Sequence, residues 1–275
     1  MSRSTGREGD PPPAPEPLAV PAFDSHCHLD IMGVPVERAL AQARAVGVTG
    51  IVQVGVDVPS SQWSARVASE YDGVVAAVAV HPNEAPRLSD LDAALAEIDR
   101  LAALPEVRAV GETGLDHFRT GPDGVVVQEE SFRRHIDIAK RHGKALVIHD
   151  RDAHSDILRI LSEEGSPDRV VFHCFSGDAE MAKVCAERGY VVSYAGNVTF
   201  KNAQHLRDSA AVAPLDQVMV ETDAPFLTPM PYRGRPNAPY LVPLTLRCLA
   251  EVKRVDLDEL CASISATGRR VFGPI

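Results

Sequence analysis

Eight short apolar runs, rich in Val, Ile and Ala, recur along the chain between longer segments of mixed polarity. The runs show little alternation of polar and apolar residues, which is typical of strands buried on both faces of a parallel sheet. We therefore expect strands at residues 22–28, 48–56, 74–81, 107–112, 145–149, 170–173, 190–194 and 217–221.

The segments between these runs have the features of amphipathic helices. Apolar residues recur about every 3.6 positions, Ser89, Asp90 and Asp92 suit a helix start, and Gly143 and Gly189 suit helix ends. A strand followed by a helix, repeated eight times, predicts a (β/α)8 TIM barrel, with a doubly wound open sheet as the alternative. We expect the helices at residues 36–45, 61–70, 88–104, 128–142, 154–164, 179–188, 202–210, 241–253 and 256–266.

The 275 residues are enough for one such domain, since a TIM barrel takes about 250 residues. Residues 1–21 contain the segment PPPAPEP and predict a disordered tail, which leaves residues 22–275 for a single barrel domain.

Composition limits the function classes. The formal charge is −10, which argues against broad electrostatic adhesion to nucleic acid but does not exclude a nucleic-acid substrate. The first residues lack the apolar segment of a secretory signal, and no apolar run is long enough to span a membrane, so we expect a cytoplasmic protein with no membrane partner. No obligate protein partner is evident. The odd number of cysteines predicts reduced thiols that serve as packing residues.

The candidate chemistry lies where the apolar runs end. Residues two apart on a strand face the same way, so His26 and His28 can hold one ion together. In a TIM barrel, the carboxyl ends of the strands form one mouth, where catalytic groups collect. Four histidines and two carboxylates are more ligands than one tetrahedral site can take, and they suit two divalent ions. The identity of the ions is open among Mg, Mn, Zn, Fe and Ni. The predicted metal ligands are His26, His28, Glu112, His149, His173 and Asp223.

Two of these carboxylates are also predicted to be catalytic. Glu112 can bridge two cations with its two oxygens, and Asp223 can accept a proton from the attacking water. Two roles are open for Asp24, to orient a histidine ring or to serve in a turn. Glu221 and Asp116 are interpreted as supporting carboxylates.

Other polar residues near strand ends could bind substrate. His81 ends the third run and is predicted to contact substrate or support a ligand, whereas His135 and His142 are expected to face solvent. Arginine matches phosphate oxygens in a bidentate manner. The predicted substrate contacts are His81, Arg151, Tyr232 and Arg233, and Lys201, Arg235 and Asn237 are further candidates for phosphate recognition.

The motifs DSHCHLD, GETGLD, IHDRDAH, HCFSG, YAGNVTFKNA, ETDAPFLTP and PYRGRPNAP, in this order, resemble the TatD family of metal-dependent hydrolases. The resemblance runs from about residue 23 to residue 272. It implies a (β/α)8 barrel, a divalent metal centre on the same six ligands, and deoxyribonuclease activity of the 3′-to-5′ exonuclease kind, with single-stranded DNA or strand ends as substrate. Two positions depart from the family's pattern: Gly268 stands where an Asn is frequent, and Asn83 where a second His is frequent.

Two other functions stay open. The same fold and metals could hydrolyse another ester or amide bond, such as an aminoacyl-tRNA ester, a lactone or a small molecule. A metal-stabilised binding protein without turnover is the other alternative, which an intact set of six ligands disfavours.

Overall fold

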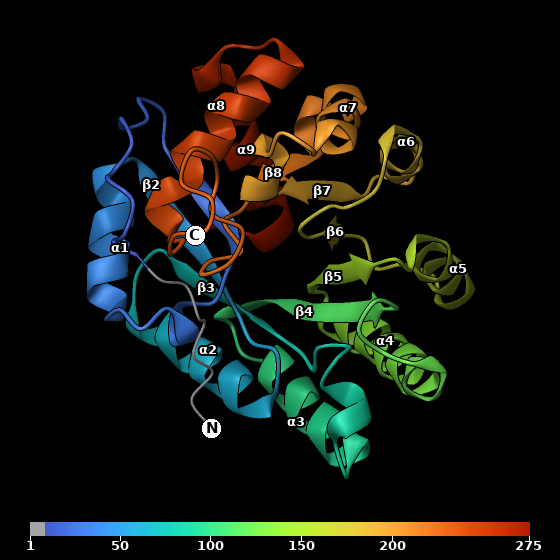
Figure 1. Ribbon diagram of the computed structural model, residues 1–275. Helices are drawn as coiled ribbons and strands as arrows, with labels where there is room; N and C mark the ends of the chain where they lie inside the picture. The colour runs from blue at the N-terminus through green and yellow to red at the C-terminus, as the bar shows by residue number, and fades with distance from the viewer. Residues whose placement is uncertain (1–8) are drawn as a thin grey trace. The chain divides into compact units, whose positions relative to one another are not determined.

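The computed structural model describes residues 9–275, in which eight strands alternate with helices (Figure 1). The strands are β1 (Ala22–Cys27), β2 (Val48–Val54), β3 (Val74–Val78), β4 (Val107–Asp116), β5 (Ala145–Arg151), β6 (Val170–Phe172), β7 (Val191–Tyr194) and β8 (Val218–Val220). The helices are α1 (Val36–Ala45), α2 (Val58–Glu70), α3 (Leu91–Ala102), α4 (Pro122–His142), α5 (His154–Glu164), α6 (Ala179–Glu187), α7 (Gln204–Val212), α8 (Val242–Lys253) and α9 (Leu257–Phe272).

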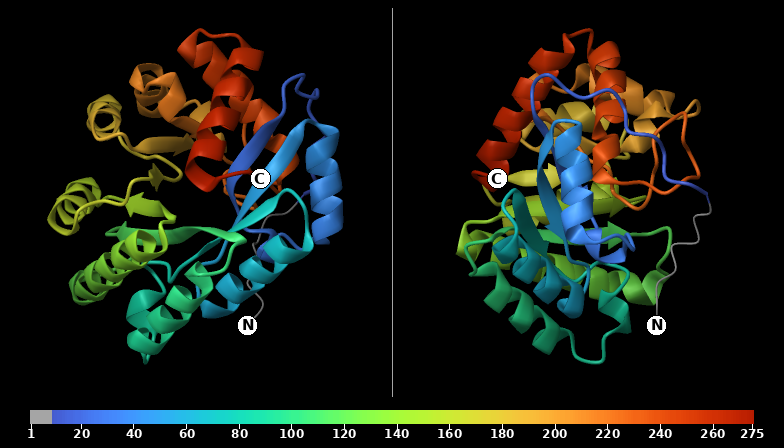
Figure 2. Two further views of the ribbon diagram at one scale, coloured as in Figure 1. Left: turned by 180° about the vertical axis from the view of Figure 1, so that it is seen from behind. Right: turned by 90° about the vertical axis from the view of Figure 1, so that its left-hand side faces the viewer.

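The order of the strands in the sheet follows the chain from β1 to β8, and the paired strands are parallel. Figure 2 shows the same elements from two further sides. This topology is that of the (β/α)8 TIM barrel and confirms the predicted fold class. All eight strands overlap the predicted runs.

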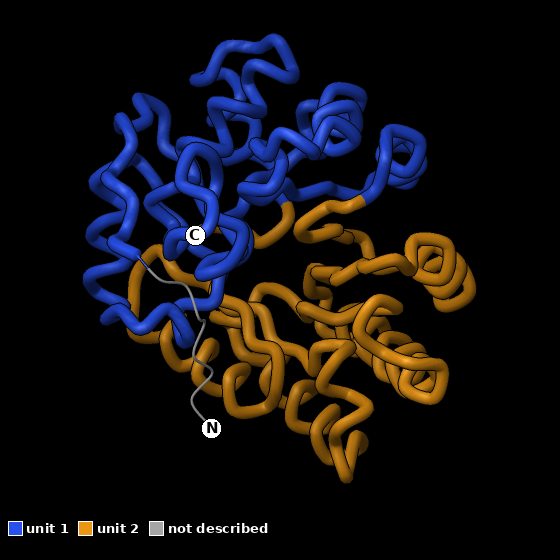
Figure 3. The backbone as a smooth tube through the Cα atoms, in the orientation of Figure 1, with its two compact units in different colours: residues 1–52, 177–270 blue, residues 53–176, 271–275 orange. Residues whose placement is uncertain are grey.

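The chain forms two compact units (Figure 3). The first comprises the chain up to Val52 together with Gly177–Arg270, and the second comprises Gln53–Ser176 with Val271–Ile275. Each unit contributes its own group of candidate ligands.

In the second unit, β3 to β6 pair in parallel, with α2 packed on β3 and α4 on β4. Gly114 of β4 lies against the backbone of β5, and a Cβ atom there would overlap the carbonyl oxygen of His149. Its φ of 134° also favours glycine. This close approach fixes β4 against β5, the two strands that bear Glu112 and His149.

In the first unit, β7 pairs with β8, and an isolated parallel bridge joins Cys27 to Ala224. Helix α9 packs so closely on β1 that a Cβ atom on Gly268 would overlap the ring of Phe23. The departure from the family's pattern at residue 268 therefore has a packing reason.

The N-terminal segment differs from the predicted disordered tail over residues 1–21. Residues 1–8 lie outside the described residues. From residue 10 onward, however, backbone carbonyls accept hydrogen bonds from the side chains of Arg235, Tyr240 and Arg247, and Leu18 is buried. Proline-rich composition indicated disorder, but prolines also leave carbonyls available to donors elsewhere in the fold.

Helix starts follow local capping chemistry. Asp57, Asp90 and Asp178 each accept a hydrogen bond from a backbone N–H in the first turn of α2, α3 and α6. Gly143 ends α4 with a left-handed conformation, as predicted. Within residues 9–275, none of the helices combines the length and apolar character that a membrane crossing requires.

Candidate metal centre

The first unit brings together His26, His28 and Asp223. Their ligand atoms all lie within 4.8 Å of one another. The Nε2 atoms of His28 and His26 lie 3.5 and 4.0 Å from Oδ1 of Asp223. The two rings meet edge to face with centroids 5.1 Å apart, and Cys27 between them is fully buried. The period of two that suggested a shared ion thus places both rings beside the same carboxylate.

Backbone hydrogen bonds hold the strand end β1 beside the segment after β8. The N–H of Asp223 donates to the carbonyl of His26 at 2.9 Å, and the N–H of His28 donates to that of Ala224 at 2.8 Å. Asp223 has a φ of 53°, a left-handed conformation that Asp tolerates better than most residues. This turn directs its carboxylate toward the two histidines.

A buried carboxylate, Asp24, supports this arrangement. Its oxygens accept hydrogen bonds from the N–H groups of Thr222 and His26 and from the Thr222 hydroxyl. Burial raises the pKa of Asp24 to about 7, although the bonds from Thr222 lower it. Of the two roles considered for Asp24, the structure favours the turn: it ties β1 to the segment that bears Asp223.

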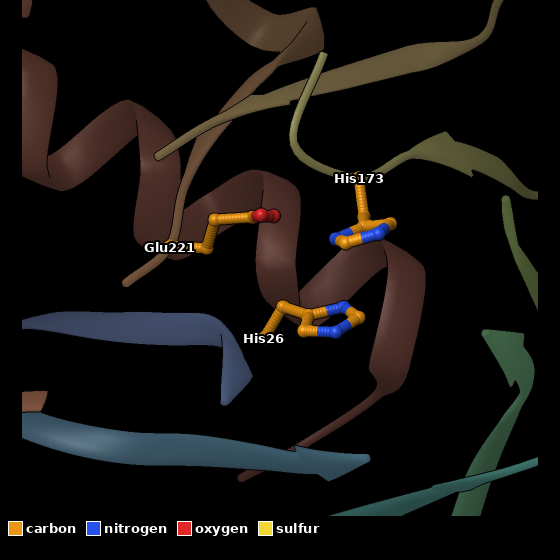
Figure 4. A group of neighbouring side chains, drawn as sticks. All are labelled: His26, His173 and Glu221. Atoms are coloured by element: carbon orange, nitrogen blue, oxygen red, sulfur yellow. The ribbon is translucent and has the colours of Figure 1, made fainter. Parts of the chain in front are cut away.

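Glu221 lies closer to the candidate ligands than the sequence suggested. It is fully buried, and it offers a ligand atom within 4.8 Å of one on His26. Figure 4 shows the side chains of His26 and Glu221 as sticks, together with that of His173 from the second unit. Glu221 therefore joins the donor set of the first unit.

The second unit gathers three histidines around Glu112. Oε1 of Glu112 lies 2.7 Å from Nε2 of His81 and 3.6 Å from Nδ1 of His149, and Oε2 lies 3.3 Å from Nε2 of His173. Glu112 is on β4, His149 is on β5, and His173 follows β6. Parallel pairing of these strands brings their side chains to one place.

Hydrogen bonds distinguish the roles of His81 and His149. Nδ1 of His81 accepts from the N–H of Asn83 at 3.0 Å, so its Nε2 bears the proton and donates to Glu112. His81 therefore orients Glu112 rather than offering a lone pair to an ion. Burial lowers the pKa of His81, although Glu112 opposes the shift. In His149, Nε2 faces Asp116 at 3.3 Å, which leaves Nδ1 toward Glu112.

Asp116, at the end of β4, is a supporting carboxylate whose partners the sequence did not predict. It accepts hydrogen bonds from Asn83 at 2.8 Å and from the N–H of Arg119 at 2.9 Å. Burial raises the pKa of Asp116, but the bonds from His149 and Asn83 outweigh burial and lower it overall. Asn83, where the family often has a histidine, thus holds the partner of His149.

The donor chemistry of each unit fits a divalent cation. Imidazole nitrogens and carboxylate oxygens are ligands of Zn, Mn, Fe and Ni, and buried carboxylates are costly unless they are paired or bind a metal. In the first unit, His26, His28 and Asp223 would hold an ion, with Glu221 beside His26. In the second, Glu112, His149 and His173 would do so.

Of the four predicted substrate contacts, the two arginines stack on aromatic rings and His81 contacts a candidate ligand. Arg151 lies 4.1 Å from the ring centroid of Phe118, and Arg233 lies 4.3 Å from that of Phe200. Tyr232 is partly exposed on the loop after β8. His81 instead contacts Glu112, so the structure favours its supporting role.

Two other phosphate candidates have structural partners instead. Asn237 is buried and donates to the carbonyls of Thr222 and Phe226, on either side of Asp223. The guanidinium of Arg235 donates to the carbonyls of Asp10 and Pro11. Neither contact could be foreseen, because each joins a loop to a segment without periodic pattern.

The prediction that His135 faces solvent is wrong. Its side chain is fully buried on α4, where Nε2 accepts from the N–H of Val80 at 3.1 Å and Nδ1 lies 2.7 Å from the carbonyl of Ser131. His142 is half-buried and pairs with Asp99 at 2.7 Å. The apolar neighbours Phe132, Ile136 and Ala139 on the same helix were the available signal for His135.

The family model for TatD-related DNase matches residues 23–273. A metal-dependent hydrolase named TatD from Mycobacterium tuberculosis is 45% identical over 258 residues, covering 91% of this chain and 97% of the relative. YcfH from Escherichia coli, also described as a metal-dependent hydrolase, is 39% identical over 255 residues, covering 90% and 94%.

Solved structures agree with these relatives. YjjV, a TatD homolog from Escherichia coli, matches with a TM-score of 0.84 at 28% identity, over 91% of this chain and 97% of that chain. A TatD family hydrolase from Entamoeba histolytica has a TM-score of 0.82 at 18% identity, over 94% and 100%, and supports the fold alone. The ordered motifs, the topology and these matches agree, and the chain belongs to the TatD family of metal-dependent hydrolases.

Proposed function

We propose that this hydrolase is a deoxyribonuclease that cleaves phosphodiester bonds of single-stranded DNA or strand ends, in the manner of a 3′-to-5′ exonuclease. Two divalent ions are proposed as cofactors. When bound, such ions make water a stronger nucleophile and offset negative charge on phosphorus.

The observation that favours DNA is a pair of stacked arginines, one in each unit. Arg151, two residues beyond His149, stacks on the ring of Phe118, a residue that is 64% exposed. Arg233 stacks on Phe200 in the first unit. Exposed aromatic faces stack on nucleobases for roughly 1–3 kcal/mol each, and guanidinium groups match phosphate oxygens. Such surfaces suit a flexible strand better than a compact small molecule.

The two catalytic carboxylates have distinct surroundings. The Glu112 side chain is 6% exposed and is oriented by His81, so it serves as a fixed ligand. The Asp223 side chain is 15% exposed and sits on a sharp turn, so water can reach it. We assign proton acceptance to Asp223, and Glu112 would hold a metal ion in the second unit.

The test replaces each carboxylate by its isosteric amide. We expect Glu112→Gln and Asp223→Asn to lower kcat on an end-labelled single-stranded oligonucleotide with Mg²⁺ or Mn²⁺ by at least about 100-fold, the usual range for a lost acid–base group. Glu180→Gln, at a carboxylate whose side chain is 78% exposed, is the matched control. Circular dichroism checks folding. Full activity in either amide variant would refute these roles.

Hydrolysis of another ester or amide bond is the second candidate, and the net charge of −10 favours it because a polyanion is repelled. A substrate panel distinguishes the two. Single-stranded DNA, an aminoacyl-tRNA ester and a lactone are each incubated with and without chelator. Chelator-sensitive turnover of the ester or lactone, with DNA left intact, would replace the deoxyribonuclease proposal.

A further inference from the structure

The N-terminal segment, residues 10–18, is attached to the loop that follows β8. Arg235 donates from Nε to the carbonyl of Asp10 at 2.7 Å and from Nη2 to that of Pro11 at 3.2 Å. The hydroxyl of Tyr240 donates to the carbonyl of Pro12 at 2.6 Å. On α8, Arg247 donates to the carbonyl of Glu16 at 2.8 Å. Four donor atoms on three side chains thus meet four carbonyls of one segment, three of which are consecutive.

Proline explains why this segment can be held in this way. A proline-rich chain favours an extended conformation with no internal hydrogen bonds, so its carbonyls are available to outside donors. Its φ angles are fixed in advance, which reduces the entropy lost on ordering. Pro12 is buried, and Leu18 packs beside Gly47 at the other end of the segment.

Arg235 connects the segment to predicted substrate contacts. Its carbonyl accepts from the Thr228 hydroxyl at 2.5 Å, and its N–H donates to the carbonyl of Tyr232 at 3.1 Å. Its guanidinium lies 5.6 Å from the Tyr232 ring centroid. The residue that binds the N-terminal segment therefore also closes the loop 226–238 and packs on Tyr232, next to Arg233.

We propose that residues 10–18 form a strap that fixes the loop 226–238 for substrate, with Arg235 and Tyr240 as positioning residues. The proposal rests on the proposed function for its kinetic part only. The strap precedes residues 23–273, which match the family model, so it is a feature of this chain beyond the matched region. The strap raises affinity for a DNA strand by holding Tyr232 and Arg233 in place before binding, which reduces the entropy cost of complex formation.

The first test measures loop opening without any substrate. Trypsin cleaves after arginine, and the bond from Arg233 to Gly234 is exposed within the loop. We expect a variant lacking residues 2–16 to be cut there about tenfold faster than a variant lacking residues 2–8, which keeps every described strap contact. Cleavage after Arg188, also exposed but at the end of α6 and away from this loop in sequence, is the internal control and should not change.

A second variant keeps the test decisive if the deletion unfolds the protein. Tyr240→Phe removes only the hydroxyl that donates to Pro12 and keeps the buried ring. We expect about fivefold faster cutting after Arg233, which is the size of effect expected for the loss of one hydrogen bond. In the variant lacking residues 2–16, Tyr240→Phe should not raise the cutting rate further, because the Pro12 carbonyl that the hydroxyl contacts is absent. Equal cutting in the deletion and its control, or an added effect of Tyr240→Phe, would overturn the strap.

The kinetic test uses a single-stranded oligonucleotide with Mn²⁺. We expect the strap deletion and Arg235→Ala to raise KM about fivefold with little change in kcat, and Arg235→Lys to restore part of the loss. An unchanged KM in an active enzyme would overturn the positioning role. If the wild type does not cleave DNA, the proposed function fails, while the trypsin measurements still decide whether the strap fixes the loop.

Discussion

At the scale of single residues, the chemistry depends on side chains that hold the candidate ligands as much as on the ligands. Asp116 shows this dependence. It accepts from Asn83 and faces Nε2 of His149, which directs the lone pair of Nδ1 toward Glu112. Partners of this kind set the tautomer and orientation of a metal-binding histidine.

We predict that Asp116→Asn lowers the affinity of the protein for Zn²⁺ or Mn²⁺ by about 10- to 100-fold, the usual cost of losing such a partner. The amide keeps the shape but lacks the negative charge that stabilises the N–H of His149. Isothermal titration calorimetry measures the change, and Asp92→Asn, at a side chain that is 85% exposed, is the matched control. An affinity equal to that of the control would rule out this role for Asp116.

Sequence reasoning selected the candidate ligands because each lies at or just after the end of a predicted apolar run. It could not identify the contacts of Asn83, Asn237 or Arg235. Those contacts join loops, whose sequences have no hydrophobic period. Which polar groups meet there depends on the folded backbone and cannot be predicted from the pattern. The six-ligand set itself remains a prediction, of which the structure places three members together in each unit.

At the scale of elements, the strands were predictable and their exact ends were not. Helix α4 begins at Pro122 rather than at the predicted residue 128, since proline suits the first turn of a helix even where the apolar period is weak. Strand β4 continues beyond Glu112 to Asp116, because Gly114 allows it to lie against β5. A sequence period does not reveal such close contact.

The contact at Gly114 gives a prediction for this pair of strands. Gly114→Ala should lower the free energy of unfolding by roughly 1–3 kcal/mol, because the new Cβ atom meets the His149 carbonyl and the φ of 134° is unfavourable for alanine. Urea denaturation measures the loss. Gly121→Ala, where no atom lies within 4 Å of the added Cβ, is the control and should lose less stability, because only the poorer N-cap preference of alanine acts there. Equal stabilities would mean that β4 can move away from β5 without cost.

At the scale of the whole molecule, alternating strands and helices were sufficient to predict the fold class, because a parallel sheet needs a helix to return the chain after each strand. What the pattern could not reveal was which polar groups the fold would bury. His135 is the clearest example: it looks like a surface residue in sequence, yet its ring lies in the interior and receives the N–H of Val80.

That burial predicts how stability depends on pH. Burial lowers the pKa of His135 from an ordinary 6.5 to about 4, with Arg134 adding to the shift and the Ser131 carbonyl opposing it. Between these values the unfolded chain binds a proton that the folded chain does not, so stability falls as pH drops. The loss from this residue between pH 7 and pH 5 is about 2 kcal/mol.

Urea denaturation at pH 7 and pH 5 measures that loss, and His135→Gln is the variant that removes it. Glutamine can still accept from the N–H of Val80 but does not titrate, so its stability should fall less than that of the wild type over the same interval, whatever its value at pH 7. His205→Gln, at an exposed position on α7, should retain the wild-type dependence. If His135→Gln also retained it, the imidazole would have to be protonated in the folded protein at pH 5, which would contradict its acceptance of a backbone N–H at Nε2.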